Sequence, residues 1–153
     1  MWQRIQTVFL LIAIVSLLAT IFLPIWGYQA GDGTVHELYP LHYSTSLSGV
    51  RTTTYFPYCI TAILAIASAT LALISVRRYD NRMLQMKLGA LNSLFITGVI
   101  ASAIIFSNMV KGDYAGAYGY GLWVPAIAVV CNLVANQFIR RDEKLVRDSN
   151  RLR

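Results

Sequence analysis

Long apolar stretches alternate with short polar segments along this chain. Four of the stretches contain no Asp, Glu, Lys, Arg or His, and they cover residues 8–26, 55–76, 88–110 and 122–139. Each is long enough for a transmembrane helix, which needs about 17–25 residues to cross the hydrocarbon core of a bilayer. We therefore predict an all-α membrane protein, in which residues 1–153 form a single domain built as a four-helix transmembrane bundle.

The polar segments between these stretches differ in length. Residues 27–54 form the longest connection and mix turn residues with short β-prone runs, so we expect at most a small β-hairpin there. The connection after the third stretch, KGDYAGAYGYGLW, is short and rich in glycine, which predicts a turn. Residues 140–153 form a charged tail after the fourth stretch.

The composition agrees with this pattern and excludes an ordinary soluble domain. Hydrophobic residues make up 56% of the chain and charged residues 13%, whereas soluble domains have about 45–50% and about 25%. The first apolar stretch also exceeds the roughly 7–15 residues of a signal-peptide core, so we expect it to be retained as a helix, with cleavage as the alternative.

The basic residues predict the orientation in the membrane. If the N-terminus is cytoplasmic, eleven of the thirteen Lys and Arg residues fall on the cytoplasmic side, and only Arg51 and Lys111 lie outside. These eleven are Arg4, Arg77, Arg78, Arg82, Lys87, Arg140, Arg141, Lys144, Arg147, Arg151 and Arg153. Such a bias in short loops orients helices strongly, so we place both termini in the cytoplasm. The basic face would then meet an anionic inner leaflet. No pattern of interleaved aromatic and basic residues suggests a nucleic-acid partner.

Aromatic residues gather near the predicted outer helix ends. They are Trp26, Tyr28, Tyr55, Phe56, Tyr58, Tyr114, Tyr118, Tyr120 and Trp123. Rings with one polar edge settle at the level of the lipid headgroups, so we interpret them as an interface belt. An aromatic ligand cleft is the alternative.

Small and polar residues inside the apolar stretches predict how the helices pack. Ala62, Ala65, Ala69 and Ala72 follow one helix face, and we expect this face to meet a second stripe on the third helix. That stripe comprises Gly89, Ser93, Thr97 and Ala101. Four asparagines, Asn92, Asn108, Asn132 and Asn136, are expected to hydrogen-bond between helices. The alternative is a substrate path lined by neutral polar groups, although no ionisable residue lies at depth to carry a proton or an ion.

Two groups of residues in the outer connection raise the possibility of chemistry. His36, Glu37 and His42 contain metal-ligating groups, but their spacing matches no zinc pattern. Asp32, His42 and Ser44 form the constituents of a hydrolase triad without a nucleophile elbow. We therefore predict no catalytic residue, no metal site and no cofactor.

Three motifs carry a resemblance to a known family. They are MWQRIQTVFLLIA at the start, NRMLQMKLGALNSLF before and within the third stretch, and ANQFIRRDEKLVRDSNRLR at the end. Together they resemble a Bacteroidota membrane family, domain of unknown function 4293, over essentially the whole chain. The resemblance implies four helices in a bacterial cytoplasmic membrane and brings no activity.

All three motifs lie at the predicted cytoplasmic ends of the helices. Their polar residues are Gln3, Arg4, Gln6, Asn81, Arg82, Gln85, Arg141, Asp142, Glu143 and Arg147. We expect these side chains to form one polar layer, with Arg4 paired to Asp142 or Glu143. The alternative is that each side chain extends separately to the headgroups.

The predicted function is a non-enzymatic scaffold that docks a protein partner through this face. A carrier or binder of small molecules or lipids within the bundle is the alternative.

The charged tail also has an apolar stripe. Phe138, Leu145 and Leu152 recur at steps of seven, with Ile139 and Val146 beside them. This spacing predicts a short amphipathic helix beyond the membrane, which lies on headgroups or on a partner.

The predicted pairing of Arg4 with Glu143 is testable by charge reversal. Glu143→Arg should lower the melting temperature, and combining it with Arg4→Glu should restore the melting temperature if the two charges attract each other. The melting temperatures of the two single variants and the double variant are measured in detergent. Effects that simply add would show that the residues are not paired.

Overall fold

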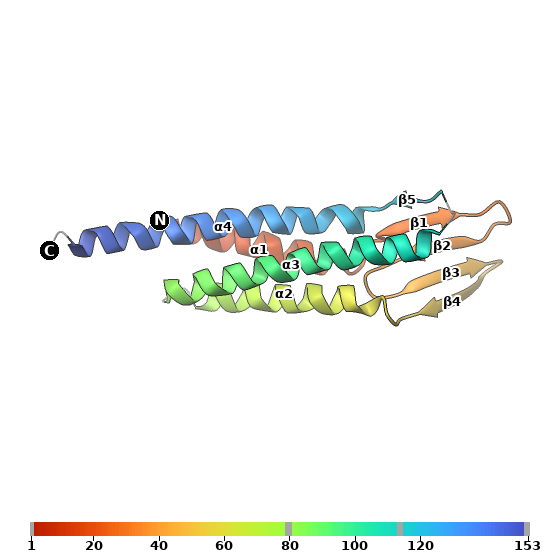
Figure 1. The fold of residues 1–153 in the computed structure, drawn as a ribbon, viewed down its shortest axis with the longest axis horizontal. Coiled ribbons are helices and arrows are strands. Elements are labelled where there is room, and N and C mark those ends of the chain that lie inside the picture. The colour runs from red at the N-terminus through yellow and green to blue at the C-terminus, as the bar shows by residue number, and fades with distance from the viewer. Residues whose placement is uncertain (1, 79–80, 113–114, 152–153) are drawn as a thin grey trace.

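The computed structural model describes residues 2–78, 81–112 and 115–151, with side chains described for 5–78, 81–112 and 115–147. Its helices are α1 (Trp2–Thr20), α2 (Cys59–Arg77), α3 (Arg82–Lys111) and α4 (Tyr120–Arg151). Its strands are β1 (Trp26–Gln29), β2 (Val35–Leu38), β3 (Tyr43–Leu47), β4 (Val50–Thr54) and β5 (Ala117–Tyr118). The helices lie side by side and the strands extend from one end of them (Figure 1).

Each helix packs against two others. α1 contacts α4 and α2, and α3 contacts α2 and α4, so the four form a closed ring. Both chain ends lie at the end of the molecule opposite the sheet, as does the connection between α2 and α3 (Figure 1). We call this the tail end and the opposite one the sheet end.

Three of the helices are long and apolar enough to cross a membrane. They are α2, α3 and residues 120–147 of α4. The described part of α1 that is apolar, Ile5–Thr20, is shorter. Four helices are therefore present, as the sequence predicts, and for three of them length and composition alone are sufficient for a membrane span.

The prediction of an all-α protein is wrong, because residues of both outer connections form an antiparallel sheet of five strands. The strand order is β4-β3-β2-β1-β5, so β5 of the second connection pairs with β1 of the first. Trp26 lies opposite Tyr118, and Gly27 lies opposite Ala117. The predicted turn in the second connection therefore contains a short strand, and the expected small hairpin is one part of a larger sheet.

The first apolar stretch divides between a helix and this sheet. α1 ends at Thr20, and the predicted span continues to residue 26. Pro24 lacks a backbone N–H and disfavours helical geometry in the residue before it, so the helix cannot run through it unchanged. Ile25 then donates its N–H to the carbonyl of Leu38 at 2.7 Å, which begins the strand pairing. Ile25, Trp26 and Leu38 are buried together at the sheet end. Ile25 and Trp26 are therefore apolar because they are buried in this core, and they do not extend the helix.

The glycines of the second connection allow a close approach to the first. A Cβ atom on Gly116 would overlap the Trp26 indole, and one on Gly119 would overlap the carbonyl oxygen of Pro24. Gly119 also donates its N–H to the carbonyl of Ile25 at 2.8 Å. The second connection is therefore rich in glycine because it lies directly on the segment that contains Pro24 and Trp26.

The predicted aromatic belt is only partly present. Tyr120 and Trp123 are strongly exposed near the sheet end of α4, but Trp26 is fully buried. Several other rings stack along the sheet and onto the helices. Tyr28 stacks on His36, and Tyr43 contacts Tyr58, each with ring centroids about 6 Å apart. These rings form part of the protein core at the sheet end.

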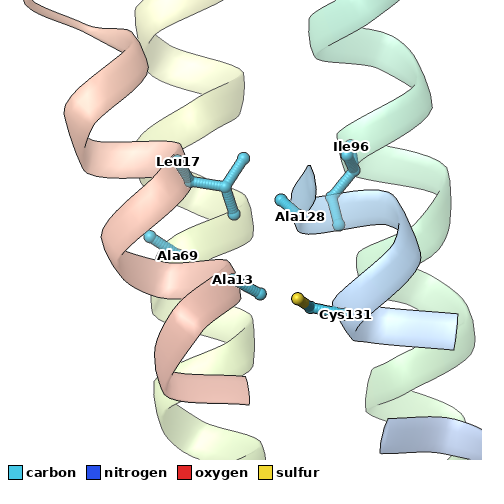
Figure 2. Close-up of a cluster of buried hydrophobic side chains, with 6 residues drawn as sticks. All are labelled: Ala13, Leu17, Ala69, Ile96, Ala128 and Cys131. Carbon is cyan, nitrogen blue, oxygen red and sulfur yellow. The ribbon is translucent and has the colours of Figure 1, made fainter. Parts of the chain in front are cut away.

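Apolar side chains, most of them small, fill the centre of the bundle. Ala13 and Leu17 of α1, Ala69 of α2, Ile96 of α3, and Ala128 and Cys131 of α4 form one buried cluster (Figure 2). The alanine stripe of α2 is buried as expected. The stripe on α3 is different, because Thr97 and Ala101 are exposed. Gly89 is buried against Asn136 of α4, so the expected contact of this stripe with α2 is wrong.

The contact between the two connections predicts a position-specific effect of adding one methyl group. Gly119→Ala should lower the free energy of unfolding by roughly 1–3 kcal/mol, because the new Cβ overlaps Pro24. Gly31→Ala is the control, since no atom lies within 4 Å of the added Cβ. The measurement is thermal unfolding of both variants in the same detergent. Equal melting temperatures would contradict the close contact.

Candidate functional site

A chain of hydrogen bonds between neutral side chains links three helices inside the bundle. Ser68 Oγ on α2 donates to Asn92 Oδ1 on α3 at 2.6 Å, and Asn92 Nδ2 donates to Asn132 Oδ1 on α4 at 3.0 Å. Asn132 Nδ2 in turn donates to Ser93 Oγ at 2.8 Å and to the Gly89 carbonyl at 3.1 Å. Ser68, Asn92 and Asn132 are buried. These asparagines therefore bond between helices, whereas Asn108 is exposed on the outer side of α3.

A second buried polar group lies nearer the tail end. Gln85 of α3 donates its Nε2 to the carbonyl oxygen of Ser75 on α2 at 2.8 Å. Gln85 Oε1 and Ser75 Oγ have no hydrogen-bond partner among the described residues. Gln6 of α1 is also buried. Gln6 and Gln85, two residues of the predicted polar layer, thus lie inside the bundle and away from its surface.

An ion pair joins the start of α3 to α4 at the tail end. Arg82 Nη2 lies 3.3 Å from Asp142 Oδ2, and Arg82 Nη1 donates to the Asp142 carbonyl oxygen at 3.3 Å. Asn81 precedes this arginine and caps α3, because its side chain accepts the N–H of Leu84 at 3.0 Å. The cap and the ion pair together fix the first turn of α3 beside α4.

A groove of about 470 Å³ lies beside this ion pair. Its lining residues are Asn81, Arg82, Met83, Glu143 and Val146. Five residues predicted for the polar layer therefore lie close together here, namely Asn81, Arg82, Asp142, Glu143 and the neighbouring Arg141 on α4. Arg147 is exposed one turn further along α4.

Part of the predicted layer lies outside the described side chains. Gln3 and Arg4 belong to α1, but their side chains are not among those described. The predicted pairing of Arg4 with Asp142 or Glu143 therefore stays a prediction. The partner that the structure gives Asp142 is Arg82.

The tail forms no separate helix, because α4 continues without a break to Arg151. At the end of the predicted span, Ile139 is buried and Phe138 stacks on Phe9 of α1, with ring centroids 6.1 Å apart. One heptad later, Leu145 is 57% exposed and Val146 is 41% exposed. The apolar stripe thus begins inside the bundle and continues on an uncovered surface, and Leu152 lies outside the described residues.

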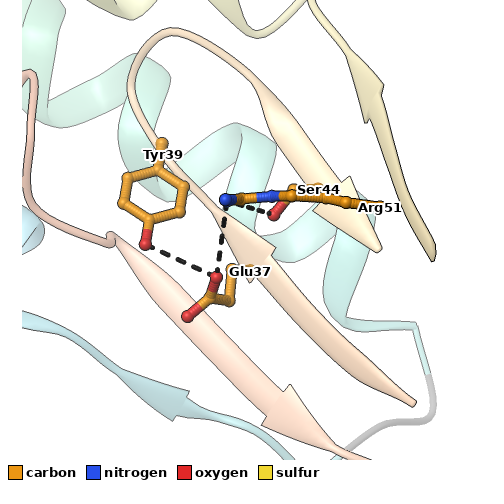
Figure 3. Close-up of polar contacts among 4 residues, drawn as sticks. All are labelled: Glu37, Tyr39, Ser44 and Arg51. Carbon is orange, nitrogen blue, oxygen red and sulfur yellow. Dashed lines mark hydrogen bonds and ion pairs between the residues drawn. The ribbon is translucent and has the colours of Figure 1, made fainter. Parts of the chain in front are cut away.

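The sheet end carries a different polar cluster (Figure 3). Arg51 Nη2 lies 3.7 Å from Glu37 Oε2 and donates to Ser44 Oγ at 3.1 Å. Tyr39 donates its hydroxyl to the same carboxylate oxygen of Glu37 at 3.4 Å. Partial burial and the negative charge of Glu37 raise the pKa of Tyr39 above its usual value. The cluster joins β2, β3 and β4, so its contacts stabilise the sheet.

The residues considered for metal binding and hydrolysis are engaged separately. His36 Nδ1 lies 2.7 Å from the Tyr43 hydroxyl, and His42 stacks on Tyr39 with centroids 5.1 Å apart. Burial and the positive charge of Arg51 lower the pKa of His42. Asp32 accepts the Thr34 N–H at 2.9 Å, which lowers the pKa of Asp32. Among the described residues, no three His, Cys, Asp or Glu side chains are grouped so that they would hold a metal ion.

The model of one protein family matches residues 2–152, which is nearly the whole chain. Its description is Domain of unknown function (DUF4293). No curated protein matches the chain. The description assigns no activity, so this match brings no catalytic or binding residue.

The interhelical hydrogen bonds predict different effects for two asparagines on α3. Asn92→Leu should lower the free energy of unfolding by about 1 kcal/mol, since it removes two bonds worth about 0.6 kcal/mol each. Asn108→Leu makes the same chemical change on the exposed side and should have little effect. Reversible unfolding in mixed micelles measures both. Equal destabilisation of the two variants would argue against the interior network.

Proposed function

This chain belongs to the family described as Domain of unknown function (DUF4293), and we propose that it is a multi-pass protein of the bacterial cytoplasmic membrane. In this proposal α1, α2, α3 and α4 all cross the bilayer, and both termini are cytoplasmic. Its role is non-enzymatic: it docks a protein partner at the tail end. The observation that carries the docking proposal is the apolar stripe of α4, which continues past the bundle without cover.

The outward side chains of the bundle support four spans. Large apolar side chains face outward on every helix, for example Val15 on α1, Ile63 on α2, Leu94 on α3 and Val130 on α4, each at least 60% exposed. In water such a surface would be costly, whereas in lipid it is solvated. α1 thus has the same kind of outer surface as the three longer helices.

The distribution of charge supports a cytoplasmic tail end. The described basic residues of this end include Arg77 and Arg78 at the end of α2, Arg82 and Lys87 at the start of α3, and Arg140 in the last part of α4. Lys and Arg accumulate on the cytoplasmic side of membrane proteins. The sheet would then face the opposite side of the membrane.

The projecting part of α4 defines the chemistry of the partner. From Arg140 to Arg147 it carries four basic residues, Arg140, Arg141, Lys144 and Arg147, against Asp142 and Glu143. Asp142 is already paired with Arg82, which leaves the surface around Leu145 and Val146 basic. We infer a partner with an acidic rim around an apolar centre, because such a surface complements both features.

The interior of the bundle supports the alternative function, a carrier of small molecules or lipids, less well than it supports a structural role. Asn92 and Asn132 bond to each other across the helices, and Ser68 completes the chain from α2. A transport path would need these groups to be available to a substrate. Their mutual bonding favours a structural role in holding the helices together.

A photocrosslinking amino acid at position 146, introduced in the full chain in its native membrane, tests the docking surface. We expect a discrete adduct with a second protein, and the control at Lys144 should give little, because the two positions lie on opposite sides of the helix. Leu145→Asp should reduce partner binding by about tenfold or more, because burial of a leucine is worth about 1.5–3 kcal/mol, while Leu145→Met should retain it.

Three results would contradict the proposal. They are adducts with lipid alone, adducts only between copies of this chain, and equal adduct yields at positions 144 and 146. Extraction of the protein by an alkaline wash would contradict the membrane placement on which docking depends.

A further inference from the structure

A second groove lies between α3 and α4, on the outer side of the bundle. Its volume is about 380 Å³, and its lining residues are Ala90, Ser93, Leu133, Asn136, Gln137 and Arg140. Arg140 follows the last residue of the predicted fourth span, so in the proposed membrane it lies at the level of the inner headgroups. Leu133 lies seven residues deeper, which is about 10 Å along the helix.

Small residues on α3 create the room for this groove. The amide of Asn136 occupies the space where a Cβ atom of Gly89 would be, and the next residue, Ala90, is small and exposed. Gly89 thus lets α4 approach closely, and a long side chain at position 90 would fill the groove. The groove is therefore open because residue 90 is small.

The polar wall of the groove has unused hydrogen-bonding and charge capacity. Asn136 is only 9% exposed, and its Oδ1 is enclosed beside Gly89, so this oxygen is out of reach of a molecule in the groove. Arg140 is exposed and forms no ion pair with a described acidic residue, since the nearby Asp142 is paired with Arg82. Gln137 is exposed between them. The wall thus offers the cation of Arg140 and the amide donors of Gln137.

The opposite part of the groove is apolar and continues toward the middle of the proposed membrane. Leu133 lines the groove and is about half exposed, and Val130 follows one turn deeper on the same side of α4. Leu94 lies one turn beyond Ala90 on α3 and is 68% exposed. An apolar track therefore leads away from the polar wall, as an amphiphile with a charged head requires.

We propose that this groove binds one anionic phospholipid of the inner leaflet, with its phosphodiester at Arg140 and Gln137 and an acyl chain along Leu133 and Leu94. Phosphatidylglycerol is the matching probe, because the negative charge of its phosphodiester complements Arg140. The inference rests on the membrane placement proposed above and is independent of the docking partner, because its residues lie on another part of α4.

The test measures how much phosphatidylglycerol the purified full chain retains. The protein is equilibrated in micelles that contain equal amounts of phosphatidylglycerol and phosphatidylcholine, and native mass spectrometry counts the bound molecules. Arg140→Gln should lower the phosphatidylglycerol-bound fraction by about fivefold or more, since it removes the charge-assisted contact with the phosphodiester in addition to the general attraction. Ala90→Trp should also lower it by filling the groove.

Matched controls separate a built site from general attraction. Arg141→Gln removes the same charge from the neighbouring position, outside the groove lining, and Ala101→Trp adds the same bulk on an exposed part of α3. Both should lower phosphatidylglycerol retention clearly less than the corresponding groove variants, because neither position contacts the bound lipid. Melting temperatures of all four variants show whether the fold is intact.

Three outcomes would overturn the proposal. They are equal losses for Arg140→Gln and Arg141→Gln, retention of phosphatidylcholine as strong as that of phosphatidylglycerol, and displacement of the lipid by excess inorganic phosphate, which would indicate a soluble anion. Leu145→Asp should leave lipid retention unchanged. Loss of the crosslinked partner with retained lipid therefore counts against docking alone, and the reverse result counts against the lipid site alone.

Discussion

The hydrogen bond between Asn92 and Asn132 fixes the register of α3 against α4, and other contacts follow from that register. The two helices run in opposite directions, so residues equally far from this bond along each helix come to lie at the same level (Figure 1). Arg82 lies ten residues before Asn92, and Asp142 lies ten residues after Asn132, and these two form the ion pair at the tail end. In lipid there is no hydrophobic drive between helices, so such polar contacts carry more of the specificity than they would in a soluble core.

The sequence predicts the helices well because hydrocarbon demands long uninterrupted apolar segments. It predicts the sheet poorly for two reasons. The strands have two to five residues, and the first of them, β1, begins with Trp26, whose apolar character resembles a continuing span. β5 consists of Ala117 and Tyr118, too short for any alternation to be visible. The signal that was available is the spacing of Gly116, Gly119 and Gly121, which indicates a backbone that lies directly on another segment.

The polar residues at the tail end were identifiable individually, but their partners were not. Arg82 and Asp142 are sixty residues apart, and their contact depends on the register of two helices, which residue types alone do not define. The same holds for Gln6 and Gln85, which belong to the same motifs but lie inside the bundle. The stripe of α4 was predictable because it is a property of one helix. The contacts of the stripe were not predictable, because they depend on the other helices. Phe138 stacks on Phe9 of α1, whereas Leu145 stays exposed among the described residues.

The pairing of β5 with β1 has a mechanical consequence. It joins the connection between α1 and α2 to the connection between α3 and α4, so the helix ends beside the sheet are tied together in a single hydrogen-bonded unit. At the other end, α3 and α4 are tied by the partly exposed Arg82–Asp142 pair and by the asparagine chain further in. The bundle is therefore held together more firmly at the sheet end than at the tail end. Separation of the helices therefore requires least work at the tail end, where the docking surface and the lipid groove are proposed.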